Sequence, residues 1–225
     1  ISLGLVGSEM CIRDRQYILG EWSFMGFDFK VGRGVLIPRD DTEVVVNLCI
    51  DFLKNRTDKK TVDLCSGSGA IAVALDKISG AKVTAVEIDE TAFSYLETNV
   101  KENNSSVKPV MANALEICET FADGELDLIV SNPPYIKSAD IETLQKEVRL
   151  EPRLALDGGE DGCDFYREIV NRWSRKLKKG GALAFELGEN QADAVKALMT
   201  DKGFSDFKIS LDFGGVQRAI IGTLL

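Results

Sequence analysis

The sequence lacks the residues on which most metal and nucleophile sites depend. It contains no histidine, so imidazole is absent as a metal ligand, a general base or a member of a catalytic triad. The cysteines are odd in number, widely separated and without a C-x-x-C pair; they are Cys11, Cys49, Cys65, Cys118 and Cys163. We therefore expect neither a disulfide framework nor a metal cluster, and this pattern favours a reducing cytoplasm.

Long apolar runs and an excess of positive charge are also missing. No stretch of eighteen or more apolar residues occurs, and the mean hydropathy is -0.04, so a membrane span is not expected. The formal net charge of -9 and the isoelectric point near 4.7 oppose a broad grip on a nucleic-acid backbone. The chain of 225 residues has room for one α/β domain with a substantial core.

The chain divides into three parts by composition. Residues 1–15 show no clear period, do not start with Met and resemble a translated sequencing-adapter tail, so we exclude them as a doubtful, non-native segment. Residues 16–39 alternate aromatic and β-branched side chains between glycines, which predicts a β-hairpin and a connection. Residues 40–225 form the main domain, and the spacing of Asp40 and Glu43 suggests a capping box at its first helix.

Beyond Lys60, short apolar runs alternate with helical patterns, which is typical of βαβ units and a mostly parallel sheet. The expected strands are 61–65, 82–88, 107–112, 126–131, 182–187, 206–212 and 217–224, and the expected helices begin near Ser68, Asp89, Asp161 and Asn190. The third of these helices should carry a core-facing stripe, formed by Phe165, Ile169, Trp173 and Leu177. Gly180-Gly181 should end that helix. The last two strands are joined only by the short run Asp212-Phe213-Gly214-Gly215-Val216, so they should form an antiparallel hairpin. This α/β arrangement of seven strands, preceded by a short β-hairpin, resembles the Rossmann-like class I fold of S-adenosylmethionine-dependent methyltransferases.

A glycine-containing loop follows the first strand of this series and opens a helix. Its sequence, Asp63-Leu64-Cys65-Ser66-Gly67-Ser68-Gly69-Ala70, lets the backbone approach a ligand closely and leaves helix N–H groups free. The pattern Gly67-x-Gly69-x-x-Ala72 also satisfies a loose dinucleotide motif. By itself it does not separate NAD from S-adenosylmethionine, and a plain tight turn remains an alternative.

Three further side chains follow strands at the same edge of the predicted sheet. Glu87 ends the second strand, where a carboxylate can accept hydrogen bonds from both hydroxyls of a ribose. Asp63 adjoins the glycine loop and could meet the ammonium of a methyltransferase cofactor, or else be a capping carboxylate. Asn113 stands where an acceptor for an adenine amino group is common, although an Asn there is often a turn residue. Cys65 has no basic neighbour and reads as a turn residue.

The buried strand 126–131 stops in the corner Asn132-Pro133-Pro134-Tyr135. The Asn132 side-chain oxygen and the Pro133 carbonyl are acceptors at a strand end, and together they can hold both hydrogens of a planar NH₂ group. The ring of Tyr135 can lie against the flat face of that group. Such a corner predicts methyl transfer to an amide or exocyclic amine, which requires no histidine.

The chain resembles the family of peptide chain release factor glutamine N5-methyltransferases. The resemblance rests on residues 35–43 (VLIPRDDTE), 63–72 (DLCSGSGAIA), 130–136 (VSNPPYI) and 147–152 (EVRLEP). It implies S-adenosylmethionine as cofactor and, as substrate, the glutamine of the Gly-Gly-Gln motif in a class 1 release factor. It places Asn132, Pro133, Pro134 and Tyr135 on the glutamine side chain, and Cys65, Ser66, Gly67, Ser68, Gly69, Glu87, Ala114 and Asn132 at cofactor-contact positions.

Two departures from this family pattern stand out. Family members carry a helical N-terminal domain, which is expected to be absent here or replaced by residues 1–15, and Asn113 stands in place of a commoner Asp. The resemblance also assigns residues 37–39 to closing the site, although ordinary packing explains them equally well.

Other functions stay open at this point. An N6-adenine methyltransferase on DNA or RNA would face the same chemical problem, but the acidic charge opposes it. An NAD-binding oxidoreductase would use the glycine loop and Glu87 and leave the Asn-Pro-Pro-Tyr corner unexplained. A catalytically silent binding module is a third reading.

Overall fold

The computed structural model describes residues 19–145 and 148–225. The tail expected at residues 1–15 lies outside these described residues. The first elements are two short strands, β1 (Glu21–Phe24) and β2 (Phe27–Lys30), which pair in antiparallel register through a turn at Met25 and Gly26. This pairing confirms the hairpin expected between residues 16 and 39.

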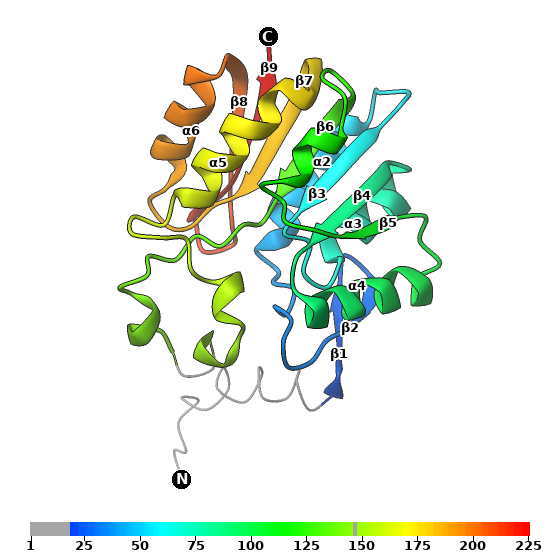
Figure 1. The fold of residues 1–225 in the computed structure, drawn as a ribbon, viewed down its shortest axis with the longest axis vertical. Helices are drawn as coiled ribbons and strands as arrows, with labels where there is room; N and C mark the ends of the chain where they lie inside the picture. The colour runs from blue at the N-terminus through cyan, green and yellow to red at the C-terminus, as the bar shows by residue number, and fades with distance from the viewer. Residues whose placement is uncertain (1–18, 146–147) are drawn as a thin grey trace.

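A seven-stranded sheet forms the centre of the molecule, in the order β5-β4-β3-β6-β7-β9-β8 (Figure 1). Its strands are β3 (Lys60–Leu64), β4 (Lys82–Glu87), β5 (Lys108–Met111), β6 (Leu126–Ser131), β7 (Leu177–Glu186), β8 (Phe204–Leu211) and β9 (Gln217–Leu224). The first five strands pair in parallel, and β9 pairs antiparallel with both β7 and β8. The seven-stranded, mostly parallel sheet with a C-terminal antiparallel hairpin is therefore confirmed.

Helices cover both faces of this sheet, as Figure 1 shows for α5 and α6 on one side. The α-helices are α2 (Thr42–Leu53), α3 (Ala70–Ala74), α4 (Glu90–Glu102), α5 (Asp164–Trp173) and α6 (Ala192–Asp201). A π-helical turn, Leu75–Ser79, continues α3, and single 3-10 turns lie at Ile117–Thr120, Ile141–Thr143, Val148–Leu150, Arg153–Ala155 and Ser174–Lys176. Apolar residues of α2, α3 and α4 form one core layer, and those of α5 and α6 form the other.

The central strand β6 is buried along its whole length, from Leu126 to Ser131. A strand in the middle of a parallel sheet has helices over both faces, so successive side chains all face a core. The apolar run leads the chain through the interior and places the next residue, Asn132, at the carboxyl edge of the sheet. The glycine loop after β3 and Glu87 at the end of β4 reach the same edge.

Local signals were wrong at two helix ends. The expected capping box fails because α2 begins at Thr42 with Asp41 as its N-cap, and no side chain caps it. Glu43 instead accepts a hydrogen bond from the Met25 amide, 3.0 Å away, in the β1–β2 turn. Gly180-Gly181 does not end a helix, because α5 ends at Trp173 and both glycines lie inside β7.

The N-terminal hairpin is fixed to the glycine loop by one buried amide. Asn99 of α4 accepts from the Lys30 amide at 2.6 Å and donates to the Lys30 carbonyl at 3.0 Å. The same Asn99 side chain donates to the Ser68 carbonyl at 2.9 Å. A fully buried amide with all these partners holds both segments in one arrangement, because leaving any partner unmade is costly. None of the helices in the described residues has the length and apolar character needed to cross a membrane.

Candidate functional site

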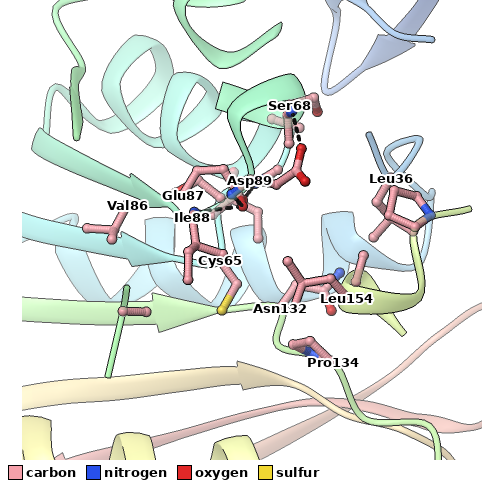
Figure 2. A pocket seen from close by; sticks show the side chains of 18 of the residues that line it. Leu36, Cys65, Ser68, Val86, Glu87, Ile88, Asp89, Asn132, Pro134 and Leu154 are labelled. Carbon is pink, nitrogen blue, oxygen red and sulfur yellow. Dashed lines mark hydrogen bonds between the residues drawn. The ribbon is translucent and has the colours of Figure 1, made fainter. Parts of the chain in front are cut away.

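A cavity of about 290 Å³ lies at the carboxyl edge of the sheet, where β3, β4 and β6 end. Figure 2 shows Cys65, Glu87 and Ile88 around it together with Asn132, Pro134, Leu36 and Leu154. Of the predicted site residues, those that line the cavity are Cys65, Ser66, Gly67, Ser68, Glu87, Asn113, Ala114, Asn132 and Pro134. Asp63, Gly69, Pro133 and Tyr135 are not among the residues that line it. The structure thus brings together the loop, the strand-end acid and the proline corner.

Left-handed backbone conformations shape the glycine loop. Cys65, Gly67 and Gly69 have φ angles of 59°, 54° and 84°. A Cβ atom at Gly69 would lie 2.5 Å from the Leu96 side chain, whereas one at Gly67 would meet nothing within 4 Å. Gly69 is therefore needed for packing against α4, and Gly67 leaves the cavity side of the loop open.

Glu87 is buried and organises the loops around it. Its Oε2 accepts the Gly67 amide at 2.8 Å, and its Oε1 accepts the amides of Ile88 and Asp89 at 2.8 and 2.9 Å. A carboxylate offers about four acceptor positions, so three of them are used by the backbone. One position on Oε2 remains for a ligand hydroxyl. The predicted contact with both hydroxyls of a ribose would need an existing hydrogen bond to be shared.

Asp63, for which a contact with the cofactor ammonium is predicted, is not among the lining residues. It is completely buried in β3, and neither of its carboxylate oxygens has a hydrogen bond of normal geometry. Burial, with the nearby Glu87 carboxylate adding to it, raises the pKa of Asp63 to about 8. Its main chain contributes more directly, since the Asp63 carbonyl accepts the Ser66 hydroxyl at 2.8 Å and so braces the loop.

Two other predicted residues behave as turn residues. Burial raises the pKa of the Cys65 thiol to about 12, with the Glu87 carboxylate acting in the same direction, which argues against a thiolate nucleophile. The Asn113 oxygen accepts the Leu115 amide at 2.9 Å, and its nitrogen donates to Glu116 at 3.1 Å. Asn113 borders the cavity, but its side chain already closes a turn.

The proline corner is held in place by side chains from distant parts of the chain. Asn132 Nδ2 lies 3.5 Å from Thr42 Oγ1, which orients the amide nitrogen toward α2. Within the described residues no group donates to Asn132 Oδ1, so this oxygen is the acceptor left for a ligand. Tyr135 is not among the lining residues, and its hydroxyl donates to Glu186 Oε1 at 3.1 Å. Burial, followed by the Glu186 charge, raises the pKa of Tyr135 above its ordinary value.

Two segments far apart in sequence border the cavity on another side. Leu36, Pro38 and Arg39 come from the connection before α2, and Pro152 and Leu154 come from the 3-10 turns after β6. Arg39 Nη2 forms an ion pair with Glu151, whose side chain is 1% exposed. The region expected to help close the site therefore does border it, and one ion pair joins its two sides.

Sequence reasoning missed several lining residues. They are Thr42, Ile88, Asp89, Leu115 and Phe165. Ile88 follows the acidic strand end directly, and its large apolar side chain is 49% exposed in the structure. Phe165, predicted in the α5 core stripe, packs against the core and also lines the cavity, since a cavity wall and a core can share one helical period. No group of three or more potential metal ligands occurs among residues 19–145 and 148–225.

Comparison with known proteins identifies the class. Residues 39–151 match the family model of the methyltransferase small domain. The fold is shared with a methyltransferase from Pyrococcus furiosus (TM-score 0.68, 23% identity, covering 96% of this chain and 98% of that one). It is also shared with the hMettl16 catalytic domain in complex with the MAT2A 3'UTR hairpin 1 (TM-score 0.74, 14% identity, covering 97% and 81%). The chain thus belongs to the methyltransferase small-domain family and has the class I methyltransferase fold.

Sequence relatives narrow this class to one family. The chain is 42% identical over 224 residues to the release factor glutamine methyltransferase of Geobacter sulfurreducens, covering 98% of this chain and 77% of that protein. It is 41% identical over 209 residues to the protein of the same name from Fusobacterium nucleatum, covering 92% of this chain. The chain belongs to the release factor glutamine methyltransferase family. It spans 58% of the length of the Fusobacterium relative.

S-adenosylmethionine fits the residues that form the cavity. The open side of Gly67, the remaining acceptor position on Glu87 and the exposed Ile88 side chain lie together on its wall. These groups offer an amide-rich loop, an oxygen acceptor and an apolar surface, which suit an amino acid, a ribose and an adenine ring respectively. The donor set thus agrees with the cofactor that the fold implies.

Proposed function

We propose that this chain methylates N5 of the glutamine side chain in the Gly-Gly-Gln motif of a class 1 peptide chain release factor, with S-adenosylmethionine as methyl donor. The observation that carries the proposal is the single cavity wall formed by Glu87, the glycine loop and the Asn132 corner, in a chain of this family. The acceptor corner lies on the same cavity as the proposed cofactor groups, so a bound NH₂ group could face a reactive methyl.

The cofactor would be held by the loop from Cys65 to Gly69, by Glu87, and by Asn113 and Ala114. When bound, S-adenosylmethionine supplies an electrophilic methyl group on a sulfonium. Asp63 is proposed to act at a distance from the ligand, by bracing the loop through its carbonyl. This assigns the recognition of the ammonium mainly to backbone groups of the loop.

The chemistry at the acceptor corner depends on two oxygens. Asn132 Oδ1 and the Pro133 carbonyl would accept the two N–H groups of the glutamine amide and favour electron density on its nitrogen as the new bond forms. Pro134 would shape the wall beside the amide, and Tyr135 would hold the corner rigid through its hydroxyl. After methyl transfer the amide nitrogen is positively charged and acidic, so its proton passes to solvent water and no strong base is required.

The partner in this proposal is the release factor itself, and no metal, membrane or direct nucleic-acid contact takes part. A cytoplasmic location belongs to the same proposal, because translation termination takes place there. An N6-adenine methyltransferase would use the same two oxygens to hold an exocyclic amine, but the sequence relatives do not favour it.

The test is to incubate the chain with methyl-labelled S-adenosylmethionine and either a class 1 release factor or duplex DNA. We expect label in the release factor, at the glutamine of the Gly-Gly-Gln motif by peptide mass analysis. A release factor with that glutamine changed to alanine is the matched control and should stay unlabelled. Label in DNA alone would refute the proposal.

A further inference from the structure

Glu186 lies where four elements of the structure meet, and no role in the proposed chemistry has been assigned to it. It ends β7, the strand next to β6, so it stands beside the start of the Asn132 corner. Its carboxylate is buried, and it accepts Thr42 Oγ1 at 2.6 Å and the Tyr135 hydroxyl at 3.1 Å. One carboxylate therefore connects the first residue of α2 with the last residue of the corner.

The direction of these hydrogen bonds fixes the orientation of Asn132. A hydroxyl has one proton, and the proton of Thr42 is given to Glu186 at 2.6 Å. Thr42 Oγ1 can then only accept from its other neighbour, Asn132, which must present Nδ2 at 3.5 Å. The amide oxygen of Asn132 is consequently turned the other way, and this is the orientation that an NH₂ substrate needs.

We propose that Glu186 is a positioning residue for methyl transfer, which as a carboxylate sets the amide orientation of Asn132 through Thr42 and fixes the ring of Tyr135. This inference rests on the function proposed above and assigns the control of the acceptor corner to a residue that touches neither cofactor nor substrate. The inference is based on the direction of two hydrogen bonds, from Asn132 to Thr42 and from Thr42 to Glu186.

Protonation of Glu186 would reverse this order. A neutral carboxyl must donate one proton, and its neighbours on that side are the hydroxyls of Thr42 and Tyr135. If Thr42 accepts this proton, its own proton turns toward Asn132, which then presents Oδ1 to Thr42 and its NH₂ to the substrate. Two NH₂ groups would face each other, so methyl transfer stops.

The surroundings of Glu186 place this change in an accessible pH range. Burial raises the pKa of Glu186 to about 6, against the opposing effects of its hydrogen bonds from Thr42 and Tyr135 and of the Arg218 charge. The charged and titratable groups that act on it are Arg218 of β9, Asp41 before α2 and Tyr135 after β6, and its main-chain carbonyl accepts the Tyr166 hydroxyl of α5. Arg218 is itself paired with Asp212 at 2.9 Å, so its charge is shared.

The decisive variant is Glu186→Gln, which keeps the shape of the side chain but offers one acceptor oxygen in place of two. We expect kcat for the release factor to fall roughly 10- to 100-fold, as for loss of a supporting hydrogen-bond partner, with the dissociation constant of S-adenosylmethionine unchanged within about twofold. The wild-type kcat should decline below about pH 6, and the variant should lose this decline. Glu189→Gln, on the exposed residue three positions on, is the matched control and should keep both kcat and the pH profile.

A second measurement separates this inference from the proposed function. The side-chain NH₂ resonance of Asn132, assigned by its loss in Asn132→Ser, should shift with pH near 6 in the wild-type protein and stay constant in Glu186→Gln. A resonance that ignores pH, or one that titrates equally in Glu186→Gln, would overturn the role of Glu186 whatever the enzyme methylates. Label in DNA instead of the release factor would overturn only the proposed substrate, and the kcat ratio would then be measured on DNA.

Discussion

The two halves of the cavity are built by different means. Around Glu87, the wall consists of backbone amides and left-handed loop residues. The Glu87 carboxylate accepts three backbone N–H groups, two from the next residues, Ile88 and Asp89, and one from Gly67, 20 positions away. Around Asn132, the wall depends on side-chain hydroxyls and a carboxylate. Their hydrogen bonds join residues that are 51, 90 and 144 positions apart in the sequence. Backbone geometry suits a group common to many methyltransferases, whereas side-chain networks can be retuned for one acceptor.

The largest effect should come from the acceptor half. Asn132→Ala removes the oxygen proposed to accept an amide N–H, and we expect a loss of about 10²- to 10³-fold in kcat, the range for removing one preorganised polar group at a reacting centre. Cofactor affinity should change little, because the glycine loop and Glu87 are untouched. Calorimetry with S-adenosylmethionine alongside steady-state kinetics checks both. Loss of binding and turnover together would contradict the division between the two halves.

The next effect should come from the cofactor half. Glu87→Ala removes a charged acceptor of the ligand, which corresponds to about 1.5–3 kcal/mol of binding free energy, or roughly 10- to 150-fold in affinity. It also releases the Gly67, Ile88 and Asp89 amides, so the loss should fall toward the upper end of this range. Glu90→Ala, at the exposed neighbouring helix start, is the matched control and should bind normally. Unchanged affinity in Glu87→Ala would remove the ribose assignment.

The same contrast explains what could be predicted from the sequence. The glycine loop, Glu87 and the proline corner are continuous stretches whose residue types encode the local geometry, and their strand ends meet because parallel strands share an edge. Thr42 and Glu186 could not be found this way, because they are 144 positions apart and gain meaning only when α2 and β7 pack together. Glu43 satisfied a capping pattern, yet its hydrogen bond to Met25 gives it another partner.

A smaller effect is expected at the two segments that border the cavity, before α2 and after β6. Arg39→Met keeps much of the side-chain volume but removes the ion pair with Glu151 that joins the two bordering segments. We expect KM for the release factor to rise several-fold, because the substrate then has to order these segments on binding. The dissociation constant of S-adenosylmethionine should stay near its wild-type value. Arg33→Met, in the same connection but outside the cavity wall, serves as the control; equal KM values in both variants would assign the ion pair to packing alone.

The smallest effect concerns the stability of the ligand-free protein, and it compares the two buried acids of the site. Burial raises the pKa of Asp63 to about 8 and that of Glu186 to about 6, each above its unfolded value. Between the unfolded and the folded pKa of each group, the folded state therefore holds more protons than the unfolded chain. The stability that both groups contribute is complete below about pH 4. It is lost as pH rises through 6 for Glu186 and through 8 for Asp63.

Asp63→Asn should abolish the upper part of this pH dependence, because the amide carries no charge at any pH. We expect its Tm at pH 8.5 to exceed that of the wild-type protein by a few degrees, with the difference narrowing as pH falls toward 5. Thermal unfolding without ligand from pH 5 to 8.5 measures this, and the exposed Asp51→Asn is the control that should follow the wild type. If Asp63→Asn is less stable than the wild type at pH 8.5, Asp63 is held as a carboxylate by the loop. The cofactor half would then also depend on a buried side-chain charge, as the acceptor half does through Glu186.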